Sequence, residues 1–209
     1  MNAVLKKLQK IGIVPVVKID RAEDAIPLAK ALCAGGLPCA EVTFRTGAAA
    51  AAIKAMTENF PQMCVGAGTV LNVEQVHAAY EAGAKYIISP NTNEAVIKET
   101  VKLGMISIPG AMTPTEIEQA YSWGAHIVKL FPADDLGAHY IKNVTAPLSH
   151  IPLMATGGVN PQTIPEYYAA GAKAFGTGIT ILKPEYVQAE NYEGIKELAK
   201  AHIDAVNSL

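Results

Sequence analysis

A single lysine interrupts an apolar run in the second half of the chain. The run reads Ile127-Val128-Lys129-Leu130-Phe131-Pro132. Lysine is rarely buried without a function, because burial disfavours the charged ammonium form. The uncharged amine is a nucleophile and forms Schiff bases with ketones. Lys129 is therefore a candidate for covalent catalysis, and the alternative is a lysine whose stem extends to solvent at a barrel rim.

Two further charged residues lie in and after the apolar run 40–44. Alternate side chains of a strand share one face, so Glu41, Thr43 and Arg45 point to one side, and Val42 and Phe44 to the other. A buried unpaired charge is costly. Glu41 and Arg45 are therefore either a structural ion pair or side chains with a chemical role.

Glycines follow three other apolar runs. Thr156-Gly157-Gly158 and Gly176-Thr177-Gly178 let backbone N–H groups approach an anion closely. In the segment Gly66-Ala67-Gly68-Thr69, the hydroxyl of Thr69 either binds a small carboxylate or caps a tight turn. These segments indicate anion binding only if the fold places them at one end of a sheet.

The fold must therefore position residues from many short strands. Eight apolar, β-branched runs recur every 20 to 27 residues or so and alternate with helical segments. The runs are 13–17, 40–44, 64–66, 86–89, 106–108, 127–131, 153–155 and 174–176. Eight such units predict a (β/α)8 TIM barrel, in which the chemistry lies at the carboxyl ends of the strands. An open doubly wound sheet is the alternative.

Helix boundaries in this pattern carry chemical markers. Thr113-Pro114-Thr115-Glu116 predicts a capping box, and asparagines stand where three other helices are expected to begin. Glycines that favour a left-handed backbone are expected to end helices. The asparagines are Asn72, Asn93 and Asn160, and the glycines are Gly35, Gly83, Gly104, Gly124 and Gly171. An amphipathic N-terminal helix is expected over 1–11, and residues 1–209 are expected to form a single domain.

Composition excludes several classes of function. The 209 residues are 50% hydrophobic and carry a formal net charge of −2, which gives no broad attraction for nucleic acid or an anionic membrane. No apolar stretch approaches the ~18 residues of a membrane span, and lysines interrupt the N-terminal apolar face, so we expect a soluble, cytoplasmic protein. The histidines lack metal-ligand spacing and are interpreted as surface or capping residues, with no metal or cofactor expected. These are His77, His126, His139, His150 and His202.

Several motifs in register resemble those of one enzyme family. The chain is similar to the class I aldolases that act on 2-keto-3-deoxy-6-phosphogluconate (KDPG) and 4-hydroxy-2-oxoglutarate (KHG). The resemblance runs from the first strand to the last helix in the same order. Its motifs are Glu41-Val-Thr-Phe-Arg45-Thr46, Gly66-Ala-Gly-Thr69-Val, Ser89-Pro90-Asn91, Ile108-Pro109-Gly110, Lys129-Leu-Phe131-Pro132-Ala133 and Thr156-Gly157-Gly158-Val159.

The resemblance implies a role for each matching position. Lys129 would form the Schiff base with pyruvate, and Glu41 would be the general acid/base. The substrate-binding residues would be Arg45 and Thr69 for the pyruvate carboxylate, Pro90 and Phe131 for the pocket wall, and Thr156. The phosphate-binding residues would be Gly157, Gly158, Gly176, Thr177 and Gly178. The family also implies a homotrimer and no metal.

The implied reaction is the reversible cleavage of KDPG to pyruvate and glyceraldehyde 3-phosphate. KHG, which gives pyruvate and glyoxylate, and 2-keto-3-deoxy-6-phosphogalactonate are the alternative substrates. One departure concerns phosphate: many members carry a serine directly after the second glycine of the last strand, and this chain carries Ile179 there. Two other readings remain open, a phosphate-binding barrel isomerase that uses Glu41 and a barrel without catalytic activity.

Overall fold

The strands of the protein form one parallel sheet, in a computed structural model that describes residues 2–209. Met1, the first residue of the expected N-terminal helix, lies outside the described residues. The strands run in the order β5-β4-β3-β2-β1-β9-β8-β7-β6. They are β1 (Ile13–Val17), β2 (Cys39–Thr43), β3 (Cys64–Gly68), β4 (Tyr86–Ile88), β5 (Ile106–Ile108), β6 (Gly110–Ala111), β7 (Val128–Leu130), β8 (Leu153–Thr156) and β9 (Ala174–Thr177).

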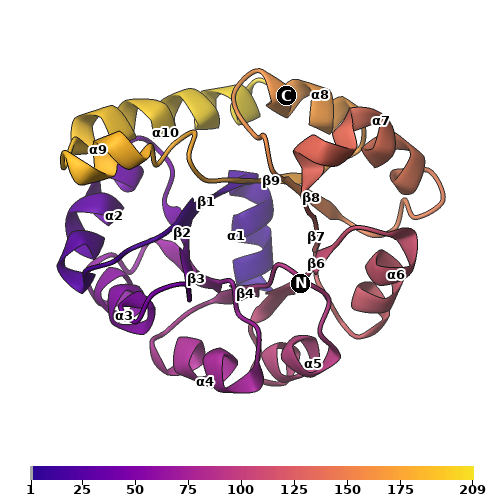
Figure 1. Ribbon diagram of the computed structural model, residues 1–209, viewed down its shortest axis with the longest axis horizontal. Coiled ribbons are helices and arrows are strands. Elements are labelled where there is room, and N and C mark those ends of the chain that lie inside the picture. The colour runs from indigo at the N-terminus through magenta and orange to yellow at the C-terminus, as the bar shows by residue number, and fades with distance from the viewer. Residues whose placement is uncertain (1) are drawn as a thin grey trace.

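The sheet closes because its two outermost strands are halves of one strand. β5 and β6 are separated by Pro109 alone, and both ends of this broken strand face β7. The backbone N–H of His126 donates to Ser107 O at 2.9 Å, and that of Lys129 donates to Pro109 O at 2.8 Å. Eight strand positions therefore surround one axis, which confirms the predicted barrel and excludes the open sheet (Figure 1).

Helices follow the strands and form an outer ring around the barrel (Figure 1). Helix boundaries agree with the expected helical segments to within a few residues. The helices are η1 (Ala22–Asp24), α2 (Ala25–Ala34), α3 (Ala49–Asn59), α4 (Val73–Glu81), α5 (Glu94–Lys102), α6 (Pro114–Ser122), α7 (Ala133–Thr145), α8 (Thr163–Ala169), α9 (Pro184–Gln188) and α10 (Tyr192–Asn207).

The residues predicted to cap the starts of helices do so, except that Asn160 is not the residue directly before its helix. Thr113 and Glu116 form a reciprocal capping box at α6, and Asn72 and Asn93 cap α4 and α5. Asn160 lies three residues before α8, and its side chain accepts from the backbone N–H of residues 162 and 163. Local hydrogen bonding therefore fixes these boundaries before any tertiary contact is considered.

One predicted stop signal, Gly35, ends its helix α2 but without the expected left-handed backbone. Four of the five glycines expected to end helices have a positive φ, whereas Gly35 has φ −78° and its neighbour Gly36 has φ +80°. A Cβ atom on Gly35 would lie 2.8 Å from the Cβ atom of Ala199 in α10. Gly35 is therefore required by the close approach of α10, a contact between distant segments.

The N-terminal helix α1 (Ala3–Ile11) closes one end of the barrel. It ends at Gly12, directly before β1, so it lies at the amino ends of the strands, where Figure 1 shows it within the ring. Its residues Leu8 and Ile11 join the hydrophobic core. The opposite end, where the strands terminate, is left for the functional groups. Within residues 2–209 no helix is long and apolar enough to cross a bilayer.

Candidate active site

The two residues with the strongest chemical signal lie on opposite sides of the barrel. Counting β5 and β6 as one strand, β2 and β7 are four strands apart in either direction around the ring. Glu41 of β2 is 1% exposed and Lys129 of β7 is 7% exposed. Burial raises the pKa of Glu41, and the positive charges of Lys129 and Arg45 partly offset this rise. The amine and the carboxylate therefore act on each other across the barrel interior.

The backbone of β3 leaves room for the carboxylate of Glu41. A Cβ atom on Gly68 would lie 2.6 Å from the Cδ atom of Glu41, so any larger residue would displace that side chain. Among the described residues nothing forms a hydrogen bond or an ion pair with the Glu41 carboxylate, and Arg45 is not a direct partner. The structural ion pair considered from the sequence is therefore wrong. A buried carboxylate without a partner is costly and indicates a functional position.

Lys129 faces an aromatic ring in place of a carboxylate. Its Nζ atom lies 4.8 Å from the centroid of the Phe131 ring. No ion pair to this amine is formed within residues 2–209. Phe131 is 38% exposed. A buried amine without a carboxylate partner is free to react with a carbonyl group.

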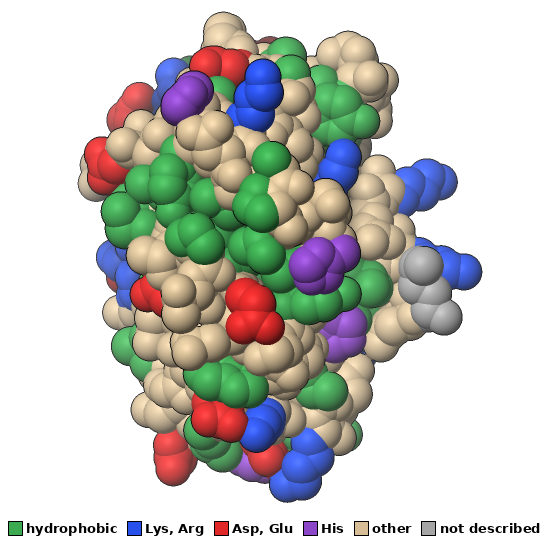
Figure 2. Space-filling model, turned by 90° about the vertical axis from the view of Figure 1, so that its right-hand side faces the viewer, with side chains coloured by type: hydrophobic (Ala, Val, Ile, Leu, Met, Phe, Trp, Pro, Cys, Tyr) green, Lys and Arg blue, Asp and Glu red, His purple; other side chains and the backbone are tan. Residues whose placement is uncertain are grey.

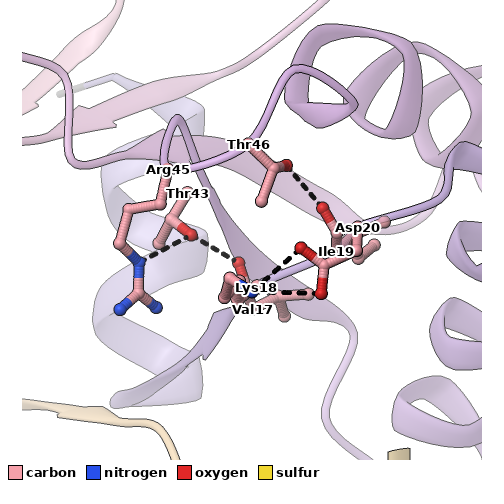
Figure 3. A network of polar contacts seen from close by, with 7 residues as sticks. All are labelled: Val17, Lys18, Ile19, Asp20, Thr43, Arg45 and Thr46. Atoms are coloured by element: carbon pink, nitrogen blue, oxygen red, sulfur yellow. Dashed lines mark hydrogen bonds and ion pairs between the residues drawn. The ribbon is translucent and has the colours of Figure 1, made fainter. Parts of the chain in front are cut away.

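A short chain of hydrogen bonds at the ends of β1 and β2 orients the side chain of Arg45 (Figure 3). Its Nε atom donates to Thr43 Oγ1 at 3.3 Å, and that hydroxyl donates to Val17 O at 3.1 Å. Lys18 pairs separately with Asp20 at 2.9 Å. The terminal nitrogens of Arg45 form no hydrogen bond with the described residues and can bind a carboxylate in a bidentate manner.

Three smaller groups surround the barrel mouth. Thr69 follows β3 with φ +54°, a conformation that costs about 1 kcal/mol or more for a non-glycine residue and often occurs at functional sites. Thr156 at the end of β8 is buried, and its Oγ1 atom makes no hydrogen bond with the described residues. Pro90 follows β4, and its carbonyl group lies against Gly110. An unsatisfied buried hydroxyl requires a partner such as a ligand.

The loops after β8 and β9 present backbone groups rather than side chains. Gly157 and Gly158 have φ +114° and φ +63°, and both lie against Asp134. Thr177 Oγ1 lies 3.2 Å from Val159 O, so its hydroxyl is engaged within the protein. The Thr177 hydroxyl is therefore not free to replace the serine hydroxyl that is missing at Ile179.

A cleft lies beside Arg45 and Gly178, and neither Glu41 nor Lys129 lines it. It has a volume of about 360 Å³ and lies at the ends of β1, β2 and β9, next to α9. Arg45, Gly178 and Ile179 line it, and Ile179 is 74% exposed. The neighbouring Gly176 is buried against Thr156 in β8. Glu41 and Lys129 are the central residues of β2 and β7, and the other predicted site residues lie near or after the carboxyl ends of their strands.

Sequence reasoning missed two buried polar residues. Tyr86 of β4 is fully buried, donates to Ala40 O at 2.6 Å and lies close enough to Glu41 for its charge to raise the phenol pKa further, after the larger effect of burial. A glycine opposite the ring, Gly66, was the available signal. His202 of α10 is 1% exposed, so its interpretation as a surface or capping residue is wrong. In residues 2–209 no three His, Cys, Asp or Glu side chains are grouped to hold a metal ion.

Comparison with known proteins gives a consistent result. The profile of the family described as "KDPG and KHG aldolase" matches residues 4–198. A Treponema pallidum protein named 2-dehydro-3-deoxy-phosphogluconate aldolase is 36% identical over 99% of both chains. An Escherichia coli protein named KHG/KDPG aldolase is 34% identical over 92% of this chain and 91% of its own.

A solved structure extends the similarity to three dimensions. The KDPG aldolase of Legionella pneumophila, with pyruvate captured as a covalent carbinolamine intermediate, has a TM-score of 0.90 and 31% identity. The match covers 96% of this chain and 98% of that one. Since both the family profile and the relatives span most of the chain, the protein belongs to the KDPG and KHG aldolase family.

Proposed function

We propose that the protein cleaves KDPG reversibly to pyruvate and glyceraldehyde 3-phosphate through a Schiff base on Lys129. The observation that carries this proposal is that Lys129 and Glu41, on opposite strands of the barrel, are both buried, influence each other electrostatically and form no ion pair within residues 2–209. The relatives named as KDPG aldolases support the reaction. The covalent pyruvate complex of the Legionella enzyme supports the intermediate.

The reaction proceeds through an electron sink formed on the lysine. The Nζ atom of Lys129 attacks the C2 carbonyl of the substrate, and the carbinolamine loses water to form an iminium ion. Deprotonation of the C4 hydroxyl then releases the aldehyde, and the electron pair of the C3–C4 bond passes into the iminium as an enamine. Protonation at C3 and hydrolysis release pyruvate and the free amine.

Glu41 transfers the protons of this sequence. As an acid it protonates the leaving hydroxyl of the carbinolamine, and the carboxylate so formed accepts the proton of the C4 hydroxyl during C–C cleavage and returns it to C3. Burial raises its pKa, which brings the acid closer to the pH at which it must work in both directions. A general acid/base with a pKa near the operating pH contributes typically 10²- to 10⁴-fold to the rate.

The remaining groups orient the two ends of the substrate. Arg45 and Thr69 bind the pyruvate carboxylate, Pro90 and Phe131 form the wall of the pocket, and the unpartnered hydroxyl of Thr156 contacts the substrate between the two ends. The phosphate is bound by backbone N–H groups after β8 and β9. This subsite consists of Gly157, Gly158, Gly176, Thr177 and Gly178.

Ile179 favours a second substrate. It places an exposed aliphatic side chain in the cleft where many relatives have a serine hydroxyl, so the preference for a phosphorylated substrate should be narrower than theirs. KHG carries no phosphate and is the second candidate. The name of the Escherichia coli relative includes both activities.

We also infer that the protein works as a homotrimer of single-domain chains spanning residues 1–209. The family resemblance supports trimer formation. Hydrophobic side chains gather on the outer face that carries α6 and α7 (Figure 2), and Tyr121 of α6 is 38% exposed. Light scattering coupled to gel filtration tests this, since a trimer of 22.0 kDa chains has three times the monomer mass.

The proposed reaction is tested by measuring pyruvate release from four purified substrates. These are KDPG, its dephosphorylated form, KHG and 2-keto-3-deoxy-6-phosphogalactonate. We expect KDPG to have the highest kcat/KM and KHG to be cleaved measurably. Absence of pyruvate release from all four would contradict the proposed function, and a higher kcat/KM for KHG would make KHG the substrate.

A further inference from the structure

His202 is a buried ionisable residue to which the proposed reaction gives no role. It lies in α10 and is 1% exposed. Its Nδ1 atom is 2.7 Å from Leu198 O, and its Nε2 atom is 3.0 Å from Thr180 Oγ1. α10 therefore reaches, through this one ring, the loop that follows β9.

The partners of the ring determine which nitrogen carries the hydrogen. A carbonyl oxygen only accepts, so Nδ1 must donate to Leu198 O. Burial lowers the pKa of His202 and favours the neutral ring, in which the second nitrogen has no hydrogen. Nε2 therefore accepts, and Thr180 is its donor.

This assignment uses the single hydroxyl hydrogen of Thr180. Thr180 Oγ1 also lies 2.8 Å from Val159 O and 2.5 Å from Thr177 Oγ1. With the Thr180 hydrogen directed to His202, the Thr177 hydroxyl, 3.2 Å from Val159 O, is the donor to that carbonyl. Two hydroxyl hydrogens thus satisfy the buried acceptors, and the loops after β8 and β9 are tied together.

Backbone N–H groups in the loop that follows β9 (the β9 loop) take no part in this network. The N–H groups of Gly178, Ile179 and Thr180 form no hydrogen bond with residues 2–209, while the carbonyl of Gly178 accepts from residues 181 and 182. Gly178 lies in open space on the side of its missing side chain, where the nearest atom to a Cβ would be 3.8 Å away. Free N–H groups on consecutive residues are suited to binding an anion.

We propose that His202 is a positioning residue for the substrate phosphate. By accepting from Thr180 it turns that hydroxyl inward toward α10 and leaves Thr177 to donate to Val159 O, which fixes the β9 loop so that backbone N–H groups, rather than hydroxyls, bind the phosphate. This inference rests on the proposed function, because it deepens the assignment of the phosphate subsite. His202 does not contact the substrate and acts through Thr180.

The test compares phosphorylated and dephosphorylated KDPG in the full-length protein. His202→Leu removes the acceptor and keeps a buried side chain. We expect the ratio of the two kcat/KM values to fall about tenfold, mainly through a higher KM for the phosphorylated substrate, which corresponds to the loss of one hydrogen bond to a charged group. The exchange of pyruvate methyl protons with D2O reports on the other half of the site and should change less than twofold.

Three further variants define the origin of the effect. His202→Gln restores an acceptor and should recover part of the ratio. Thr180→Val removes the donor and should reproduce the loss, and the double variant should lose no more than either single one, because coupled residues are not additive. His150→Leu, at a histidine outside this network that contacts Tyr121, should leave the ratio unchanged.

The outcomes separate the inference from the proposed function. An unchanged ratio in folded His202→Leu, or an equal loss for both substrates together with slower exchange, would overturn the positioning role. If that variant does not fold, an unchanged ratio in Thr180→Val would overturn it instead. If the unsubstituted protein itself shows no preference for the phosphorylated substrate, the proposed phosphate subsite is wrong.

Discussion

The two halves of the candidate site are built from different parts of the chain. The pyruvate half consists of side chains on strands, with Glu41 and Lys129 facing each other across the barrel. The phosphate half consists of loop backbone, and its hydroxyls at Thr177 and Thr180 are engaged by Val159 O and His202. In this arrangement, the making and breaking of bonds depends on a few side chains that a substitution can remove. Anion binding depends on the conformation of a loop backbone.

This difference predicts that substitutions in the first half abolish activity and those in the second change affinity. Lys129→Arg should lower pyruvate release by on the order of 10⁴-fold or more, because an arginine remains charged and cannot form a Schiff base. Lys142→Arg, at an exposed lysine of α7, is the matched control and should retain activity. Activity above about one hundredth of normal in folded Lys129→Arg would break the comparison.

Glu41→Gln should have the next largest effect. The amide keeps the shape of the side chain but cannot accept the proton, so exchange of pyruvate methyl protons with D2O should slow by about 10²- to 10⁴-fold. Proton NMR measures the exchange directly. Glu118→Gln, on the exposed face of α6, should exchange at the normal rate. Normal exchange in Glu41→Gln would assign the proton transfer to another group.

Arg45→Met should weaken binding without removing the chemistry. The loss of a hydrogen bond to a charged carboxylate costs about 1.5 to 3 kcal/mol, which is roughly ten- to a hundredfold in affinity. The KM for pyruvate in the exchange reaction should rise by that factor while the maximal rate changes little. A large fall in the maximal rate at an unchanged KM would give Arg45 a role in catalysis instead.

Ile179→Ser tests whether a side chain in the phosphate half of the site can strengthen phosphate binding. It adds a hydroxyl next to the free N–H groups of the β9 loop, at a position that is 74% exposed. We expect the ratio of kcat/KM for phosphorylated and dephosphorylated KDPG to rise by up to about tenfold, the lower end for a hydrogen bond to an anion, because water competes there. A ratio that does not rise would show that the side chain at 179 does not reach the phosphate.

The smallest expected effect concerns stability. Because burial raises the folded-state pKa of Glu41 above its ordinary value of 4.5, the folded protein binds the proton more tightly than the unfolded chain does. Stability associated with this group is therefore lost as pH rises from 4.5 through the raised pKa. Glu41→Gln should be more stable than the unsubstituted protein at pH 7, by about 2 to 4 °C in Tm for each kcal/mol regained.

A pair of thermal melts at pH 5 and pH 8 checks this sign. The advantage of Glu41→Gln should be larger at pH 8, where the native carboxyl is charged. A larger advantage at pH 5, or a variant less stable at both pH values, would show that the carboxylate is stabilised in the folded protein by partners after all.

The same contrast explains what the sequence could reveal. The eight strands and the burial of Lys129 and Glu41 in the barrel were predictable, because a charge in an apolar run and a recurring helix boundary are local signals. Tyr86 and His202 were not, because each is satisfied by a residue 46 or 22 positions away. Gly35 ends α2 as predicted, but the contact with α10 that requires a glycine there could not be read from the sequence. An anion site formed by backbone N–H groups likewise gives no signal in the sequence other than glycine.

The most direct test of the central claim is to trap the covalent intermediate. The protein is incubated with pyruvate, reduced with sodium borohydride and digested for mass spectrometry. Our account predicts one reduced pyruvyl group per chain, located on Lys129, and none on Lys129→Arg. Modification of a different lysine, or no modification while the protein releases pyruvate from KDPG, would contradict a Schiff base on Lys129.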